Sequence, residues 1–330
     1  MDITRILNSM QYWYRNDFGW FVKNKLVTDP ISNLYFYMLG LLGDGHLIPA
    51  ASVAITYGFS MALLWKCACR FNLSHVEMIF LLFVVIGNIT FFYAASNMRI
   101  YMCFAIIAYF TYQELIENKN HIIAPFFYVI CVFFHYACVP FVLFRYLAGR
   151  YRRLNLRVVL GVCLLLVVAS QLGNILSFLH ISSGLLYTIQ YKLIRYSTYD
   201  TFGPEYFLNS IIKALGFIAL LVITSLSLKK HSECARKMLY FAFWAATLYV
   251  LMLSNYQMVI RLPSMLAMII IPVFSIFSSE SNKHSIMFPH TKTRLQNNKH
   301  VLMIILLITT LSNILFEAHY LIARNVFFEG

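Results

Sequence analysis

Arg99 is a lone cation in a stretch that otherwise reads as lipid-soluble, AASNMRIYMCFAIIAYF from Ala94. Burying a cation in hydrocarbon is costly, so a membrane protein that keeps one there has a use for it. The planar guanidinium group offers two parallel N–H donors, which match the oxygens of a phosphate. Arg99 is therefore a candidate diphosphate ligand. The alternative is an arginine that anchors a helix end by extending its charge to the lipid headgroups.

Arg261 and His135 are two further candidates for binding or transforming a phosphate-containing substrate. Arg261, in YQMVIRLPSM, repeats the pattern of Arg99, with the same alternative. His135, in VFFHYACVPF, could act as a general acid or base or bind substrate, because imidazole titrates near roughly pH 6.5. Its alternative is a packed core histidine. Cys131, His135 and Cys138 could share one helical face, but no fourth metal ligand is evident, so we expect no metal.

The segment YTIQYKLIRYSTYDTFGPEYF combines tyrosines with charged side chains. Aromatic faces and carboxylates suit sugar rings, so Tyr196, Tyr199 and Glu205 are candidate sugar contacts. Arg195 is a third candidate phosphate ligand, and Asp200 is a candidate base. The alternative is an aromatic belt at the membrane interface.

The elements that hold these residues follow from composition. The chain has 330 residues, of which 60% are hydrophobic and 12% charged, and its mean hydropathy is +0.70. Its apolar runs are continuous, and several approach the roughly 20 residues that span a bilayer core. We therefore expect one membrane-embedded, all-α domain over residues 1–330, with about ten membrane helices. The apolar runs lie at 46–66, 76–95, 98–116, 158–179, 207–228, 238–255, 258–279 and 300–320, with a long run at 122–147.

The charges set the orientation. The formal net charge is +13, and the basic residues gather between spans, which indicates cytoplasmic loops rather than nucleic-acid binding. The run 122–147 has a cytoplasmic loop at each end, so it must enter and return as a hairpin or re-entrant pair. Pro125 and Pro140 offer breaks, and His135 lies near the turn. Arg99, Arg261 and the periplasmic loop 180–206 then face outward. We expect residues 1–45 to form an outer segment with an interfacial helix at 31–43. The alternative is that 31–43 crosses the membrane and the N-terminal residues lie inside, which their basic side chains would favour.

The combination of Arg99 at the start of a helix with His135-Tyr136-Ala137 farther along resembles the EpsG/Wzy-type polysaccharide polymerases. The later arginine of that pattern matches Arg261. The aromatic stretch QYWYRNDFGWFVKNKLVTDPISNLYFYMLG resembles the family's first outer loop and the short helix after it. Ile100 departs from the pattern, because the family usually has glutamine after this arginine.

The resemblance implies a GT-C-like, metal-independent glycosyltransferase without a cofactor, multi-pass in the bacterial inner membrane. Its substrate would be an undecaprenyl-diphosphate-linked oligosaccharide, polymerised at the periplasmic face, and a chain-length regulator could be a partner. Fixed cations would stabilise the departing diphosphate, with His135 as the first candidate base and Asp200 as the second. Two alternatives stay open: a flippase for the same lipid-linked sugars, and a membrane O-acyltransferase that modifies surface sugars.

Overall fold

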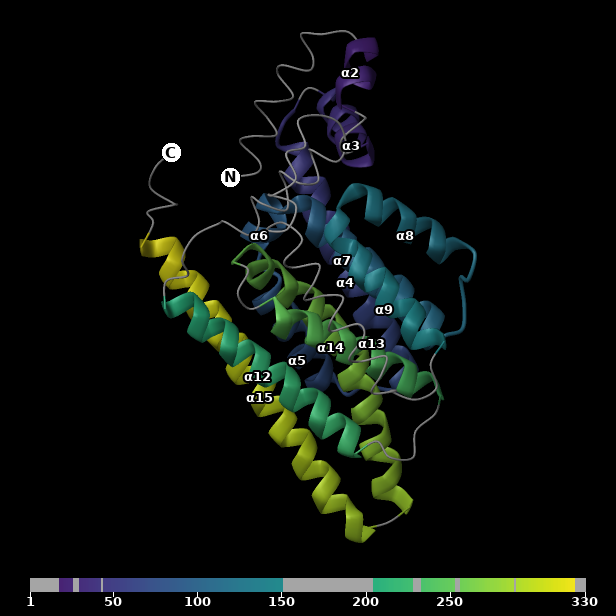
Figure 1. The fold of residues 1–330 in the computed structure, drawn as a ribbon. Helices are drawn as coiled ribbons and strands as arrows, with labels where there is room; N and C mark the ends of the chain where they lie inside the picture. Colours follow the sequence, from purple (N-terminus) through teal and green to yellow (C-terminus); the bar gives the residue numbers. More distant parts are fainter. Residues whose placement is uncertain are drawn as a thin grey trace, which may run out of the picture. The chain divides into compact units, whose positions relative to one another are not determined.

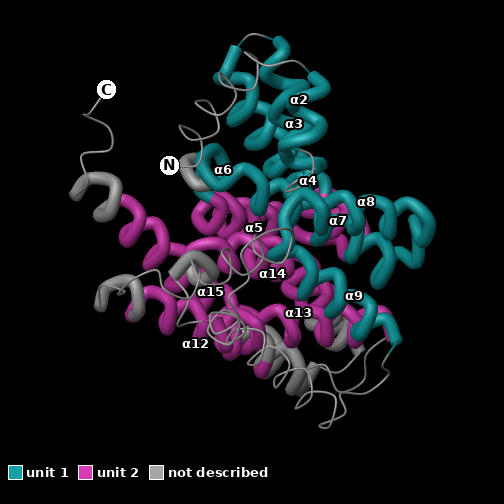
Figure 2. Tube along the Cα trace, turned by 45° about the horizontal axis from the view of Figure 1, so that its top comes forward, with its two compact units in different colours: residues 1–62, 90–199 teal, residues 63–89, 200–330 magenta. Residues whose placement is uncertain are grey.

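The computed structural model describes residues 18–25, 30–42, 44–150, 204–227, 233–252, 256–287 and 289–323. All regular structure in these ranges is helical, which confirms the all-α prediction. The chain divides into two compact units, each described by itself below (Figure 2). Unit 1 comprises residues 1–62 and 90–199, and unit 2 comprises residues 63–89 and 200–330.

Three helical segments of the described chain are long and apolar enough to cross a bilayer. They are α4 (Leu47–Phe71), the part Ile260–Ser279 of α14 (Tyr256–Met287) and the part Asn297–Ala318 of α15 (Pro289–Ala323). They coincide with the apolar runs expected at 46–66, 258–279 and 300–320, so the protein has the helices of a membrane protein. The total of about ten spans and the GT-C-like architecture stay predictions, and the run 158–179 lies outside the described residues.

Unit 1 begins with short aromatic helices. Phe21 of α2 (Phe18–Lys25) and Phe36 of α3 (Pro30–Gly40) are fully buried, and they form a core cluster with Ile48 and Met98. Helix α3 falls in the segment where a helix was expected, 31–43, and its position at the membrane interface stays a prediction. The rest of the unit consists of the first part of α4, then α6 (Phe91–Ser96), α7 (Met98–Leu115), α8 (Ile123–Phe134), the 3-10 turn η1 (Tyr136–Cys138) and α9 (Val139–Arg150).

Helices α8 and α9 form the predicted hairpin, with α7 as its backing (Figure 1). Cys131 of α8 lies against Cys103 of α7, and Tyr128 lies farther down beside Thr111, so α8 runs antiparallel to α7. Helix α9 runs parallel to α7. Phe141 of α9 contacts Phe104, and the later residue Arg145 contacts the later residue Glu114. The chain therefore reverses between the two helices.

Each arm has 12 residues, about 18 Å of helix at 1.5 Å per residue. This is shorter than the roughly 30 Å of a bilayer core, as a re-entrant pair requires. Pro125 and Pro140 lie in the first turns of α8 and α9, where a missing N–H costs no helical hydrogen bond.

Unit 2 contains α5 (His75–Asn88), α12 (Pro204–Ser227), α13 (Glu233–Leu251), α14 and α15. Helix α15 packs along both α12 and α5, and α13 packs on α14 (Figure 1). Two glycines allow the close approach of α15. A Cβ at Gly216 would lie 2.2 Å from Cγ2 of Thr309, and one at Gly87 would lie 2.4 Å from Cγ2 of Thr310. Small residues of this kind are the usual means of close helix packing in membranes.

The beginning of α5 carries a buried carboxylate. Ser74 and Glu77 form a reciprocal capping box, in which the Glu77 carboxylate accepts the Ser74 N–H at 2.7 Å. The same carboxylate accepts a hydrogen bond from Ser278 of α14 and forms an ion pair with Lys299 of α15. One side chain thus joins the first helix of the unit to its last two.

The expected continuous span at 76–95 is wrong. Helix α5 ends at Asn88, and the next helix, α6, begins at Phe91. Side-chain hydrogen bonds explain where α5 stops, because the Asn88 amide donates both to the Val84 carbonyl (2.9 Å) and to Thr310 Oγ1 of α15 (3.1 Å). Such local bonds compete with continuation of a helix.

Candidate functional site

Arg99 and His135 lie at the same end of unit 1. Arg99 is one turn before Cys103 on α7, and His135 is one residue past α8, one turn after Cys131. The thiol of Cys103 lies 3.7 Å from the carbonyl oxygen of Cys131, which sets the register of these antiparallel helices. The guanidinium of Arg99 is within electrostatic range of the Cys103 thiol. The register therefore places the arginine and the histidine that the sequence singled out at the same end of these two helices.

The backbone at the hairpin tip orients His135. The residue is extended (φ −155°, ψ 116°), and its N–H still donates to the Cys131 carbonyl at 2.8 Å. Its Nδ1 accepts the N–H of Ala137 at 3.2 Å, so the imidazole caps η1. A neutral imidazole has one N–H, and here Nδ1 is the acceptor, which assigns the proton to Nε2. His135 is thus arranged as a hydrogen-bond donor through Nε2.

Aromatic side chains of the N-terminal helices pack on this tip. The rings of Tyr35 and Phe134 meet edge to face with centroids 5.4 Å apart, and Phe36 lies beside them. The Tyr35 hydroxyl shares a hydrogen bond with Ser52 Oγ at 3.3 Å. Burial raises the pKa of Tyr35 and the bond to Ser52 lowers it by less, so the phenol stays protonated. Aromatic rings therefore border the Arg99–His135 end of unit 1.

The shared metal-binding face considered for the hairpin is interrupted. Cys131 is on α8, whereas His135 is in the break and Cys138 is in η1. Among the described residues, no group of three histidine, cysteine or acidic side chains is arranged to hold a metal ion. The thiols of Cys103, Cys131 and Cys138 are instead buried within interaction range of one another, where α7 meets the hairpin.

The other predicted site residues are distributed differently. Arg261 is half-buried on α14, and its carbonyl accepts a hydrogen bond from Ser264 at 2.7 Å. It belongs to unit 2, whereas Arg99 and His135 belong to unit 1, so the convergence of all three stays a prediction. Glu205 lies in the first turn of α12. The remaining predicted residues fall outside the described chain: Arg195, Tyr196, Tyr199 and Asp200.

The sequence reasoning missed a polar network at the base of the hairpin. Glu114 of α7 is 5% exposed, and one oxygen of its carboxylate accepts hydrogen bonds from Tyr128 of α8 (2.7 Å) and Arg145 of α9 (2.6 Å). The Tyr128 hydroxyl also lies 3.4 Å from Thr111 Oγ1. The available signal was an acidic residue within the apolar run 98–116, because such a residue needs a partner. The network clamps both hairpin arms onto α7.

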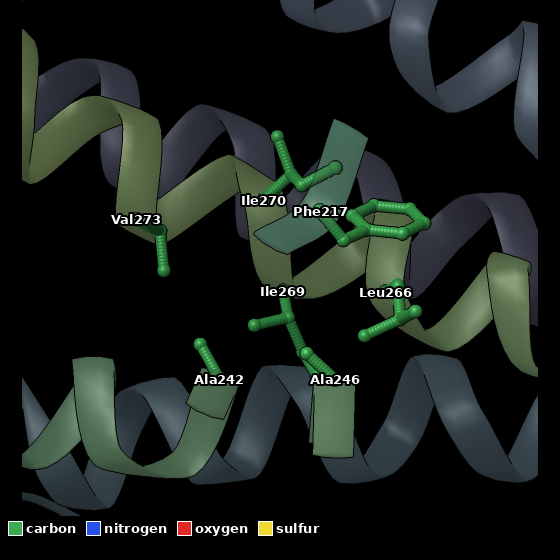
Figure 3. A pocket seen from close by; sticks show the side chains of 7 residues that line it. All are labelled: Phe217, Ala242, Ala246, Leu266, Ile269, Ile270 and Val273. Carbon is green, nitrogen blue, oxygen red and sulfur yellow. The ribbon is translucent and has the colours of Figure 1, made fainter. Parts of the chain in front are cut away.

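Unit 2 contains an apolar pocket between α12, α13 and α14 (Figure 3). Alanines at one turn's spacing on α13, Ala242 and Ala246, leave room that larger side chains would fill. The remaining lining is Phe217, Leu266, Ile269, Ile270 and Val273. The space is about 220 Å³, including volume open to the outside. The enclosed part is much smaller than the roughly 300–1,000 Å³ of most small-molecule sites, so this pocket supports no ligand site.

The chain matches no family model, no characterised protein and no solved structure.

Proposed function

We propose that the protein is a membrane glycosyltransferase that polymerises oligosaccharide units carried on a lipid diphosphate. The observation that carries the proposal is the register of α7 and α8, which brings Arg99 and His135 to one end of unit 1. The sequence orientation assigns this end to the outer leaflet. The family resemblance alone suggests three further points: an undecaprenyl carrier, action at the periplasmic face, and a chain-length regulator as partner.

The reaction needs a stabilised leaving group. The acceptor hydroxyl oxygen bonds to C1 of the donor sugar, and the C1–O bond to phosphate breaks. The lipid diphosphate departs with the electron pair. Arg99 would hold the negative charge that develops on it, with Arg261 and Arg195 as further cations. The first N–H groups of α7 add positive potential beside Arg99.

The hydrogen bond at His135 favours a revised division of roles. With Nδ1 occupied by the Ala137 N–H, the imidazole is suited to donate from Nε2 to a substrate oxygen. A neutral imidazole is known to serve as such a donor in enzymes. Asp200 then becomes the first candidate for the base that takes the acceptor proton, with the sugars meeting Tyr196, Tyr199 and Glu205.

An in vitro assay tests the proposal. Purified full-length protein is mixed with one synthetic lipid-diphosphate-linked repeat unit, and products are resolved by chain length. We expect a ladder of lengths from wild type and a loss of about 100-fold or more in rate for Arg99→Ala. Arg99→Lys should restore part of the rate, because an ammonium keeps the charge without the planar fork. Arg236→Ala, at an exposed position of α13, is the matched control.

The broken helix α5 is the observation that favours the alternative, a transporter of lipid-linked sugars. Discontinuous helices often line transport sites in membrane proteins. Genetic loss separates the two functions. Cells lacking a polymerase would display single repeat units, whereas cells lacking a flippase would display none. A normal ladder from Arg99→Ala at wild-type protein level would remove Arg99 from the mechanism.

A further inference from the structure

A lysine is buried in the apolar interior of unit 2. Lys213 lies within the apolar segment Leu208–Ala219 of α12, yet it is only 7% exposed. A lysine at this depth can extend its charge toward the lipid headgroups. Its ammonium group instead donates a hydrogen bond to Oδ1 of Asn313 on α15. Because charge in the hydrocarbon region is costly, buried intramembrane lysines mark sites where charge is held or moved.

Asn313 connects this lysine to the broken end of α5. Its amide nitrogen donates to the Gly87 carbonyl, 2.7 Å away, in the last turn of α5. Carbonyls of a last turn lack an intrahelical partner and carry the negative end of the helix dipole. Half-helix ends of this kind form ion and proton sites in membrane transport proteins. Two successive hydrogen bonds, from Lys213 to Asn313 and from Asn313 to Gly87, therefore connect a cation to the negative end of a helix.

The charged and titratable groups around Lys213 come from three neighbouring helices. From α15, the Glu317 carboxylate lies one turn beyond Asn313, within electrostatic range of Lys213. From α13, the Tyr249 hydroxyl donates to the Ser210 carbonyl at 3.3 Å. On α14, the charged residue whose side chain is described is Arg261, near the beginning of that helix. Glu317 is thus the acidic partner for the lysine.

The remaining polar neighbours are neutral. Asn209 of α12 accepts a hydrogen bond from Ser312 at 3.2 Å, and Asn88 of α5 donates to Thr310 at 3.1 Å. These side chains form a polar layer across α5, α12 and α15. They pair with one another, so they fix the geometry around Lys213 without supplying charge.

The packing restricts what the layer can bind. Helix α15 lies so close to α12 that Gly216 has no room for a Cβ beside Thr309. The pocket of Figure 3 is lined by apolar side chains and does not include Lys213. An ammonium group also repels metal cations. The ligand that fits this centre is a proton.

We propose that Lys213 and Glu317 form a proton-binding centre within unit 2. With an ammonium and a carboxylate the pair is neutral. A proton from water that bonds to the carboxylate leaves a net charge of +1, and a proton released from the ammonium to water leaves −1. Either change leaves a net charge where Lys213 is buried, so proton exchange alters the packing of α12 and α5 on α15. The proposal does not depend on glycosyl transfer.

Nuclear magnetic resonance of the full-length protein tests it. The protein carries ¹⁵N-labelled lysine and is held in nanodiscs of phosphatidylethanolamine and phosphatidylglycerol, and the Lys213 signal is the one that Lys213→Met removes. We expect this signal to change with pH along a curve that Glu317→Gln displaces. Lys237→Met is the control, because Lys237 pairs with Glu233 at 3.0 Å on the surface of α13. It should leave the Lys213 curve unchanged.

A Lys213 signal that does not titrate, or a curve that is the same in Glu317→Gln, overturns the proposal. Thermal unfolding supplies a second measurement if Lys213→Met does not fold. The Tm of wild type should depend on pH more steeply than the Tm of Glu317→Gln. Identical Tm profiles would likewise reject the proton-binding centre.

Discussion

At the scale of single residues, one hydrogen bond decides what His135 can do. The Ala137 N–H donates to Nδ1 at 3.2 Å, so Nε2 carries the proton and is the donor nitrogen of the ring. A general base needs an unprotonated nitrogen that faces the substrate. Here the unprotonated nitrogen, Nδ1, faces the backbone N–H of Ala137 instead. The residue type was apparent from the sequence, whereas its role depends on a backbone turn.

Isosteric substitutions distinguish a donor from a base at position 135. The amide N–H of glutamine reaches about the position of Nε2, whereas that of asparagine mimics Nδ1. We expect His135→Gln to retain polymerisation within about tenfold of wild type, and His135→Asn and His135→Ala to lose about 100-fold. Turnover of the synthetic lipid-linked unit measures these rates. Equal losses in all three variants would instead support a base.

At the scale of elements, Glu114 holds the hairpin to α7. The carboxylate is buried and accepts hydrogen bonds from one residue on each arm, Tyr128 and Arg145. Removing one partner of a buried ion pair leaves the other charge uncompensated, whereas removing both is far less costly.

Arg145→Met should therefore lower stability by about 3 kcal/mol. The double variant Glu114→Gln/Arg145→Met should recover part of this loss, because a neutral amide still accepts the Tyr128 hydroxyl. Thermal unfolding in detergent measures both. A double variant less stable than Arg145→Met would contradict the ion-pair account.

The glycines of unit 2 give a second test at this scale. In Gly216→Ala, the new Cβ would lie 2.2 Å from Cγ2 of Thr309, whose hydroxyl is tied to the Leu306 carbonyl at 2.9 Å. We expect a large fall in Tm, partly reversed by Thr309→Ser, which removes that methyl group. Gly58→Ala is the matched control, because nothing lies within 4 Å of its Cβ position. It should be neutral or stabilise α4 by up to about 1 kcal/mol.

At the scale of the whole molecule, the hairpin constrains topology. If α8 and α9 enter and return, Lys119 before them and Arg150 at their end face the same side of the membrane. Both positions are exposed. Single cysteines at 119 and 150, in a variant without other cysteines, should react with a membrane-impermeant maleimide only after the membrane is permeabilised. Labelling of one position from outside and the other from inside would show that the run crosses the membrane.

The sequence predicted what depends on composition and on local signals. The apolar runs located α4, α14 and α15, and the charge pattern together with Pro125 and Pro140 predicted the hairpin. It did not predict that α5 ends at Asn88, because the polar side chain that joins it, Thr310, lies 222 positions away. The burial of Lys213 was missed for the same reason, since its partner is on another helix.

Glu77 has a consequence for biogenesis. Its partners Ser278 and Lys299 lie 201 and 222 positions later in the chain. During synthesis, α5 therefore leaves the ribosome with an acidic group whose counter-ion has not yet been translated. Before Ser278 and Lys299 have been synthesised, only water and the residues of its own capping box can pair with the Glu77 carboxylate. The contacts that join α5 to α14 and α15 through this side chain therefore form late in synthesis.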